Sequence, residues 1–131
     1  IKSALEAKLK VIFCIGETLS EKRKKKTYTI LSNQIKIGLK NIKDKSKIFI
    51  AYEPVWAIGS GLVPRSQDLF KIVQFIKVKF NTKSPKVLYG GSVNPQNITN
   101  LREINNIDGF LIGGASLNAK KFIDIVKKTF N

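Results

Sequence analysis

Residues 47–61, with the sequence KIFIAYEPVWAIGSG, constrain the fold of this chain more than any other stretch. Residues 48–52 are β-branched, aromatic or small, with no polar alternation, which predicts a strand buried on both faces of a parallel sheet. Glu53 follows this strand directly, and Pro54 biases it away from helical conformation, so the chain leaves the strand extended. A carboxylate at the carboxyl end of a buried strand is a candidate site residue.

The loop after this strand is unusually apolar for a loop. It is rich in large hydrophobic residues and ends in two glycines separated by a serine. Glycines beside an apolar loop suit a segment that hinges and covers a ligand. We therefore interpret the loop as a lid, formed by Pro54, Val55, Trp56, Ala57, Ile58, Gly59, Ser60 and Gly61.

Strands are predicted to alternate with helices four times along the chain. After an opening helix over residues 1–8, strands are predicted at 10–15, 48–52, 86–89 and 109–112. Helices are predicted at 20–42, 66–80 and 94–104, followed by a single turn at 115–117 and a final helix to about 128. This alternation predicts a parallel sheet in one α/β domain, with all strand exits on one side.

Glycine-rich turns follow the third and fourth predicted strands on that side. Gly90, Gly91 and Ser92 follow one strand, and Gly113 with Gly114 follows the other. Glycines allow backbone N–H groups to approach a ligand closely, and a nearby helix start favours an anion. We interpret these turns as a phosphate site, the alternative being that they are only tight turns.

Two residues near the end of the first strand are weaker candidates. Glu17 is interpreted as a structural ion pair or a helix-start charge rather than a catalytic group. Cys14 is interpreted as a small buried residue, because it lies in an apolar strand and no histidine is present to activate it. A single cysteine cannot form an internal disulfide and fits a reducing compartment.

The composition favours a soluble globular protein. Hydrophobic residues make up 43% of the 131 residues, and no signal segment or apolar run of membrane-spanning length is present. The formal net charge of +15 raises the question of nucleic acid. The one dense cluster, residues 22–26, falls in a predicted solvated helix, so we interpret the charge as a compositional bias. A positive field would also attract a phosphorylated substrate.

Four motifs in the chain resemble one family in the right order. AYEPVWAIGSG resembles the strand-six and loop-six signature of triosephosphate isomerase, and KVIFCIGET, VLYGGSVNPQN and DGFLIGGASL resemble its fifth, seventh and eighth strand–loop segments. The resemblance runs end to end but covers only the second half of that family's sequence. It implies the carboxyl-terminal half of a TIM (β/α)8 barrel, strands five to eight, with residues 1–131 as one partial domain and the amino-terminal half absent.

The resemblance also implies a reaction, the interconversion of dihydroxyacetone phosphate and glyceraldehyde 3-phosphate through an enediol in glycolysis and gluconeogenesis. Glu53 would be the general base, because a carboxylate covered by an apolar lid loses water and becomes a stronger base. Tyr89 and Ser92 would hydrogen-bond the closed lid. The implied phosphate-binding residues are Gly59, Ser92, Gly113 and Gly114. No cofactor and no metal are implied.

The chain departs from the family's pattern in two respects. It contains no histidine, whereas the family polarises the substrate carbonyl with a histidine and a lysine from its first half. We therefore expect no meaningful isomerase activity from these residues alone. Leu62, Val63 and Pro64 stand where many members have a lysine and small residues, which predicts a stiffer second hinge.

Partners follow from the same resemblance. The complete enzyme is expected to be a cytoplasmic homodimer that binds a small phosphorylated triose, with no nucleic acid and no membrane. Four strands of a barrel leave open edges, so the isolated chain is expected to aggregate, pair with itself or need its missing half. A second hypothesis is a catalytically inactive half-barrel that acts as a binding or scaffolding module. It is less favoured, because such a module has no reason to retain Glu53 and its lid.

Overall fold

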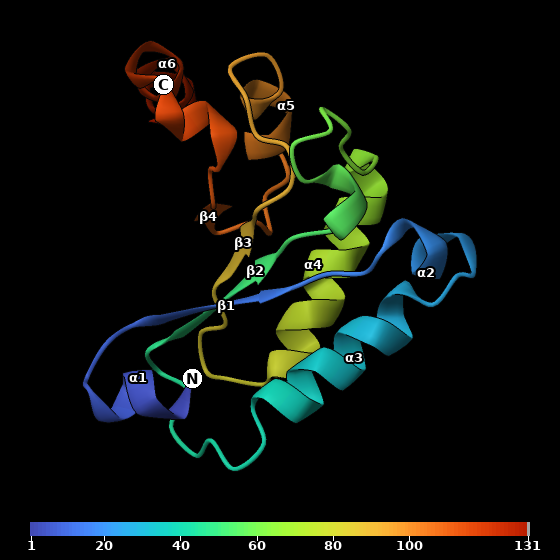
Figure 1. Cartoon of the computed structure of the whole chain (residues 1–131), viewed down its shortest axis with the longest axis vertical. Helices are drawn as coiled ribbons and strands as arrows, with labels where there is room; N and C mark the ends of the chain where they lie inside the picture. The colour runs from blue at the N-terminus through green and yellow to red at the C-terminus, as the bar shows by residue number, and fades with distance from the viewer. Residues whose placement is uncertain (131) are drawn as a thin grey trace.

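The computed structural model describes residues 1–130, which contain one four-stranded parallel sheet (Figure 1). The sheet order matches the chain order, and each strand pairs in parallel with the next. The strands are β1 (Val11–Ile15), β2 (Ile48–Tyr52), β3 (Val87–Tyr89) and β4 (Gly109–Phe110). The predicted α/β class, with the architecture of half of an eight-stranded barrel, is confirmed. The fourth strand is shorter than predicted, although the N–H of Leu111 still donates to the carbonyl of Tyr89.

Helices precede, connect and follow the strands. They are α1 (Lys2–Glu6), α2 (Leu19–Arg23), α3 (Thr27–Gly38), α4 (Ser66–Phe80), α5 (Ile98–Arg102) and α6 (Ala119–Phe130), with 3₁₀ turns η1 (Val55–Ala57) and η2 (Gly114–Leu117). Among them, α3 contacts β1 and α4 contacts β3. In Figure 1, α3 and α4 lie side by side on the right of the view, and α6 lies at the top left beside α5.

The hydrophobic core lies between the sheet and the pair α3 and α4. Apolar residues recur three or four positions apart along α4, so they form one stripe that faces the strands. Complete burial of a large aliphatic or aromatic side chain contributes about 1.5 to 3 kcal/mol. The fully buried members include Leu31, Ile50, Tyr52, Leu69, Val73, Ile76, Val87 and Tyr89.

The opposite face of the sheet has no covering layer in the described part of the chain. Ile12 on this face is 47% exposed, and Cys14 is exposed as well. The prediction that Cys14 is buried is wrong, because alternate strand residues point to opposite faces and Cys14 points away from the helices. β1 and β4 each pair on one side only, so the sheet keeps two open edges.

The predicted single helix over residues 20–42 is wrong. The structure divides it into α2 and α3 at Lys25, which adopts a left-handed φ of 57°. A capping box fixes the start of α2, since the N–H of Thr18 donates to Glu21 Oε2 (2.8 Å) and the N–H of Glu21 donates to Thr18 Oγ1 (3.3 Å). Like charges along residues 22–26 repel one another in a continuous helix, which favours the break.

The helix predicted to start at Asn94 starts at Ile98 instead. The side-chain oxygen of Asn94 accepts hydrogen bonds from the N–H groups of Gln96 (2.9 Å) and Asn97 (3.0 Å). An asparagine that bonds the backbone two residues further on stabilises a turn in competition with a helix. The residues after Ser92 therefore form a turn that precedes α5.

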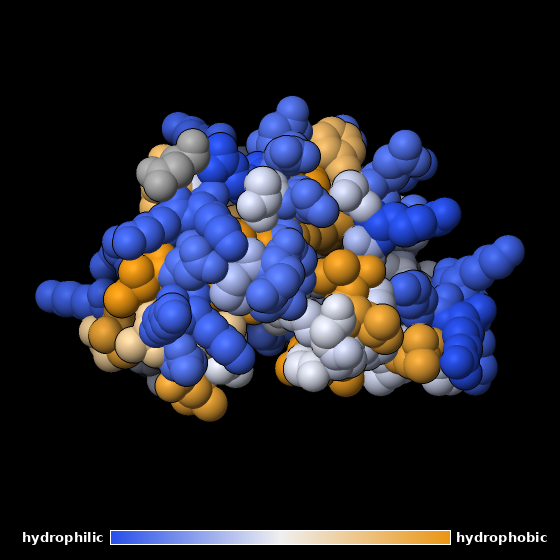
Figure 2. Space-filling model, turned by 90° about the horizontal axis from the view of Figure 1, so that it is seen from above, coloured by the Kyte–Doolittle hydropathy of each residue, from blue (hydrophilic) through white to orange (hydrophobic). Residues whose placement is uncertain are grey.

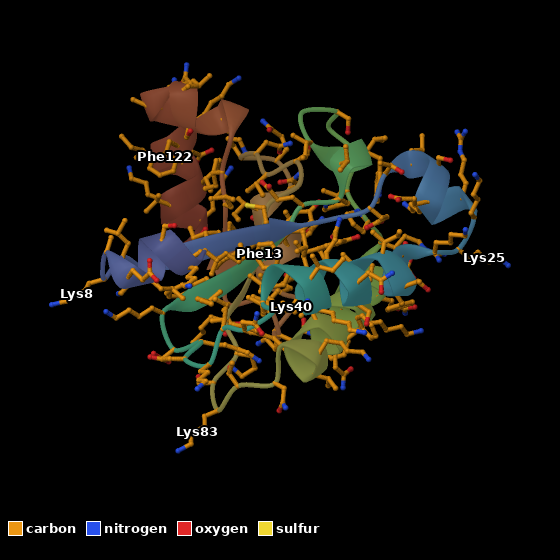
Figure 3. The ribbon with its side chains drawn as sticks, turned by 60° about the horizontal axis from the view of Figure 1, so that its bottom comes forward. Lys8, Phe13, Lys25, Lys40, Lys83 and Phe122 are labelled. Carbon is orange, nitrogen blue, oxygen red and sulfur yellow. The ribbon has the colours of Figure 1, made fainter. Side chains whose placement is uncertain are left out.

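The basic residues are distributed over the molecule. Lys8, Lys25 and Lys83 project from three separate ends of the ribbon (Figure 3). Seen from the end that carries α6 and the loops after β2 and β3, hydrophilic residues alternate with hydrophobic ones (Figure 2). A nucleic-acid surface concentrates its cations in one patch or stripe, and the absence of a nucleic-acid partner stays a prediction. No helix within residues 1–130 has both the length and the apolar character to cross a bilayer.

Asp108 joins β3, β4 and α4, and it gives the fold a pH dependence. Its carboxylate accepts from Lys77 Nζ (2.7 Å), Lys86 Nζ (3.2 Å) and the N–H of Val87 (2.9 Å). Partial burial opposes ionisation, but these hydrogen bonds outweigh it and hold the pKa of Asp108 below its ordinary value. A carboxyl group with a lowered folded pKa stabilises the fold above its unfolded pKa of about 3.9, and this contribution is lost as pH falls through the folded pKa.

We expect Asp108→Asn to lower the free energy of unfolding by about 1 kcal/mol at neutral pH. The difference from the unsubstituted chain should vanish in acid, where Asp108 itself is protonated. Urea unfolding at neutral pH and below about pH 3 checks this expectation, with the exposed Glu103→Gln as control. An equal loss at both pH values would contradict the assignment.

Candidate active site

Glu53 directly follows β2, and it lies between the carboxyl ends of β1 and β3. Its N–H donates to the carbonyl of Ile15 (2.8 Å), and the N–H of Gly90 donates to the carbonyl of Tyr52 (2.9 Å). A β-carbon at Gly90 would lie 2.6 Å from Cγ of Glu53, and one at Gly16 would overlap the carbonyl oxygen of Glu53. Glycine at position 90 therefore leaves space for the Glu53 side chain, and glycine at position 16 leaves space for the Glu53 backbone.

One cleft of about 680 Å³ contains Glu53 together with the predicted phosphate-binding residues. These four residues come from the loops after β2, β3 and β4, and they are Gly59, Ser92, Gly113 and Gly114. Ile58 of the lid and Lys121 of α6 also line the cleft. The fold thus brings three separate loops together at the carboxyl end of the sheet. No motif in the sequence pointed to Lys121, which lies in a stretch that was predicted only as the final helix.

The main chain around this cleft presents unpaired donors. Within residues 1–130, no hydrogen bond leads from the backbone N–H of any of the four predicted phosphate-binding residues to a protein acceptor. Exposed N–H groups at turns and at the start of a helical turn attract anions. The cleft can therefore bind a small anion through main-chain atoms, close to a carboxylate that can accept a proton.

The lid is attached to the loop after β3 through Ser92. The Ser92 hydroxyl donates to the carbonyl of Ala57 (2.6 Å) and accepts from the N–H of Gly61 (2.9 Å), so it contacts both halves of the lid. Gly59 and Gly61 have φ values of 65° and 77°, which favour glycine. The hydroxyl of Tyr89 is buried and makes no hydrogen bond within residues 1–130, so its contact with a closed lid stays a prediction.

Glu17 supports the first stem of the lid. It is only 1% exposed, and it accepts hydrogen bonds from the Tyr52 hydroxyl (3.1 Å) and from Nε1 of Trp56 (3.0 Å). Burial, followed by the charge of Glu17, raises the pKa of Tyr52 above its ordinary value. The ammonium group of Lys22 lies 3.2 Å from the centre of the Trp56 ring, a cation–π contact. Two groups thus hold Trp56 in place.

The sequence interpretation of Glu17 as an ion pair or a helix-start charge is wrong. Thr18 is the N-cap of α2, and Glu17 pairs with no cation among the described residues. Its hydrogen-bond partners lie 35 and 39 residues further along the chain, so no local pattern in the sequence could identify them.

We expect Glu17→Ala to lower the free energy of unfolding by about 1 to 3 kcal/mol, because the donors of Tyr52 and Trp56 lose their acceptor. Trp56 is the only tryptophan, so its fluorescence reports directly on the lid stem. Glu17→Gln retains an acceptor and should have a smaller effect, and the exposed Glu103→Gln serves as control. Unchanged emission and stability in Glu17→Ala would show that the buried carboxylate does not hold the stem.

Cys14 lies beside Glu53 on the open face of the sheet. Partial loss of water around the sulfur, together with the neighbouring Glu53 carboxylate, raises the pKa of the Cys14 thiol to about 11. A thiol with such a pKa stays protonated at neutral pH and is a poor nucleophile. This geometry agrees with the sequence interpretation that Cys14 is not a reactive group.

A parallel sheet with helices between its strands and a site on the loops at their carboxyl ends defines this chain as half of a β/α barrel. Comparison with known proteins gives a narrower result. The family model described as triosephosphate isomerase matches residues 1–129. The chain belongs to the triosephosphate isomerase family.

Curated relatives agree with this assignment. The triosephosphate isomerase of Pelodictyon phaeoclathratiforme is 48% identical, over 97% of this chain and 53% of the relative. That of Thermodesulfovibrio yellowstonii is 43% identical, over 97% of this chain and 54% of the relative. That of Yarrowia lipolytica is 44% identical, over 95% of this chain and 53% of the relative. The chain spans about half the length of the curated relatives it matches.

Proposed function

We propose that this chain supplies the carboxyl-terminal half of a triosephosphate isomerase, which interconverts dihydroxyacetone phosphate and glyceraldehyde 3-phosphate. The observation that carries the proposal is the shared cleft, in which Glu53 lies with four backbone N–H groups that have no protein acceptor within residues 1–130. A phosphorylated triose has an anion for those donors and a carbon-bound proton for the carboxylate.

The main-chain donors would hold the phosphate group, and this would fix the three-carbon chain relative to Glu53. The Glu53 carboxylate would remove a proton from the carbon beside the carbonyl and return it to the neighbouring carbon, so that the enediol lies between substrate and product. The apolar lid would exclude water, which keeps the carboxylate basic and protects the enediol. Ser92 suits this arrangement, because its hydroxyl contacts both halves of the lid, and its N–H, which has no protein acceptor within residues 1–130, would donate to the phosphate.

The chain does not supply the group that polarises the carbonyl. It contains no histidine, and in the family the electrophilic histidine and lysine precede strand five. Removal of one such stabilising group costs about a hundredfold to a thousandfold in rate. The 131 residues are therefore proposed to bind phosphate and carry the base, and to turn over substrate only with an amino-terminal half.

A turnover assay of two proteins tests the proposal. One is the 131-residue chain alone, and the other, called the joined enzyme below, is this chain fused after the amino-terminal half of the Thermodesulfovibrio yellowstonii relative. We expect isomerase turnover from the joined enzyme and none of significance from the chain alone. Near-normal rates from the chain alone, or no turnover from a folded joined enzyme, would overturn the proposal.

Assembly and location are proposed on the ground of the family alone. Residues 1–131 would form one partial domain of a cytoplasmic enzyme that works as a homodimer. Sedimentation of the joined enzyme measures the oligomeric state, and a stable monomer with full turnover would contradict the homodimer.

A further inference from the structure

The cleft around Glu53 contains charges of both signs. Among the described residues that line it, Glu53 is the only carboxylate and Lys121 the only cation. The Glu53 carboxylate repels a bound phosphate dianion, and the Lys121 ammonium group attracts it. The position of Lys121 therefore affects how strongly the cleft binds a dianion.

The backbone of Lys121 is fixed relative to the glycine pair after β4. The N–H of Ser116 donates to the carbonyl of Gly113 (2.8 Å), and this bond begins the η2 turn. Asn118 then caps α6, since its side-chain oxygen accepts from the N–H of Lys121 (3.0 Å). Each link is a short local hydrogen bond, so the first turn of α6 holds Lys121 at the mouth of the cleft.

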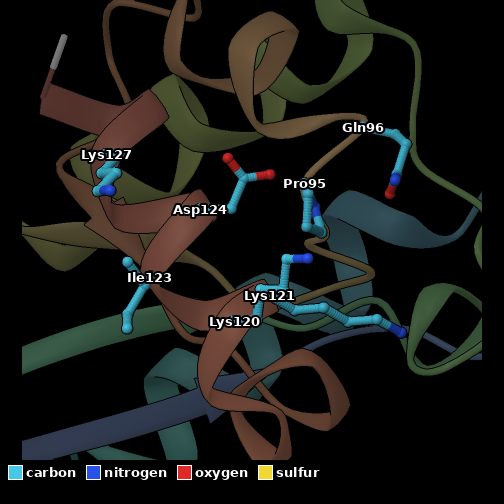
Figure 4. Close-up of a pocket in the computed structure, with 7 residues that line it drawn as sticks. All are labelled: Pro95, Gln96, Lys120, Lys121, Ile123, Asp124 and Lys127. Carbon is cyan, nitrogen blue, oxygen red and sulfur yellow. The ribbon is translucent and has the colours of Figure 1, made fainter.

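Lys121 is free to interact with a ligand. It makes no ion pair within residues 1–130, whereas the nearest acidic residue of the same helix, Asp124, pairs with Lys128 (3.0 Å). Its side chain is exposed. Lys121 lines both this cleft and the adjacent groove between α6 and Pro95, whereas the neighbouring Lys120 lines the groove and not the cleft. The two lysine side chains leave the helix in different directions (Figure 4).

We propose, resting on the function proposed above, that Lys121 is a positioning residue that supplies positive charge to the phosphate end of the cleft and thereby favours dianionic ligands. It stabilises the phosphate group equally before and during proton transfer, because the charge of that group does not change in the reaction. Lys121 therefore acts on binding and leaves the chemical step unchanged.

The test compares Lys121→Gln with Lys120→Gln, and Lys121→Arg restores the charge. Inorganic phosphate is titrated into the joined enzyme, with the amide resonances of Gly113 and Gly114 as readout. We expect Lys121→Gln to raise the phosphate Kd about two- to fivefold, as for an exposed charge pair. Lys120→Gln should leave it unchanged and Lys121→Arg should largely restore it. The difference should shrink as salt is added.

Turnover of the joined enzyme gives a second readout. Lys121→Gln should raise KM by the same factor with kcat unchanged, which a merely structural role would not produce. Equal phosphate affinities in Lys121→Gln and Lys120→Gln would overturn the inference, and so would a fall in kcat with an unchanged KM. Failure of the unsubstituted joined enzyme to bind phosphate at these glycines would instead refute the proposed function.

Discussion

Glu53→Gln is expected to lower the kcat of the joined enzyme by about a hundredfold to ten-thousandfold, the usual contribution of a general base. The glutamine side chain has nearly the same shape, so it fits beside Gly90, but it cannot accept a proton from carbon. The phosphate-binding donors are untouched, so KM should change little. Steady-state kinetics in both directions of the reaction measures both quantities.

The exposed Glu103→Gln is the matched control, and it should retain the kinetics of the unsubstituted joined enzyme. Deuterium uptake from solvent into the substrate adds an independent readout, because it follows the proton transfer itself. If Glu53→Gln kept turnover within about tenfold, another group would have to be the base.

Gly16→Ala is expected to produce the largest loss of stability, of at least about 3 kcal/mol. The added methyl group would overlap the backbone carbonyl of Glu53, and a backbone atom cannot move aside as the end of a flexible side chain can. Both the N–H and the carbonyl of Gly16 are also bonded to the side chain of Gln34 (3.0 Å each), so the turn itself has little room to shift.

Gly114→Ala is the steric control for this prediction, with stability as its only readout. A β-carbon at Gly114 meets nothing within 4 Å, and Gly114 begins the 3₁₀ turn η2, a conformation that any residue can adopt. Urea unfolding of both variants should show a large loss for Gly16→Ala and a small change for Gly114→Ala. Similar stabilities would mean that the strand ends around Glu53 are not closely packed.

The sequence predicted the features that depend on local pattern. The apolar run before Glu53 predicted β2, and the alternation of strands with helices predicted a parallel sheet. The loops after the strands of this sheet bring Glu53, Ser92 and the glycine pair after β4 together in one cleft. The motifs identified the family, which the matching residues 1–129 confirm. The catalytic and binding roles of these residues stay predictions.

Features that depend on distant contacts or on local competition were not predictable. Glu17 is buried by Tyr52 and Trp56, which follow it by more than thirty residues. Lys25 breaks a helix that periodicity alone would continue, and Asn94 forms a turn where a helix start was predicted. Cys14 is exposed because the face to which it points is uncovered in this half-barrel.

The most direct test of the central claim is a crystal structure of the joined enzyme with an unreactive triose phosphate analogue. We predict the phosphate against the N–H groups of Gly113 and Gly114, with a carboxylate oxygen of Glu53 within about 3.2 Å of the carbon that would lose its proton, or of the analogue atom that replaces it. A phosphate in the groove beside Lys120, or a Glu53 side chain directed into solvent, would contradict this account.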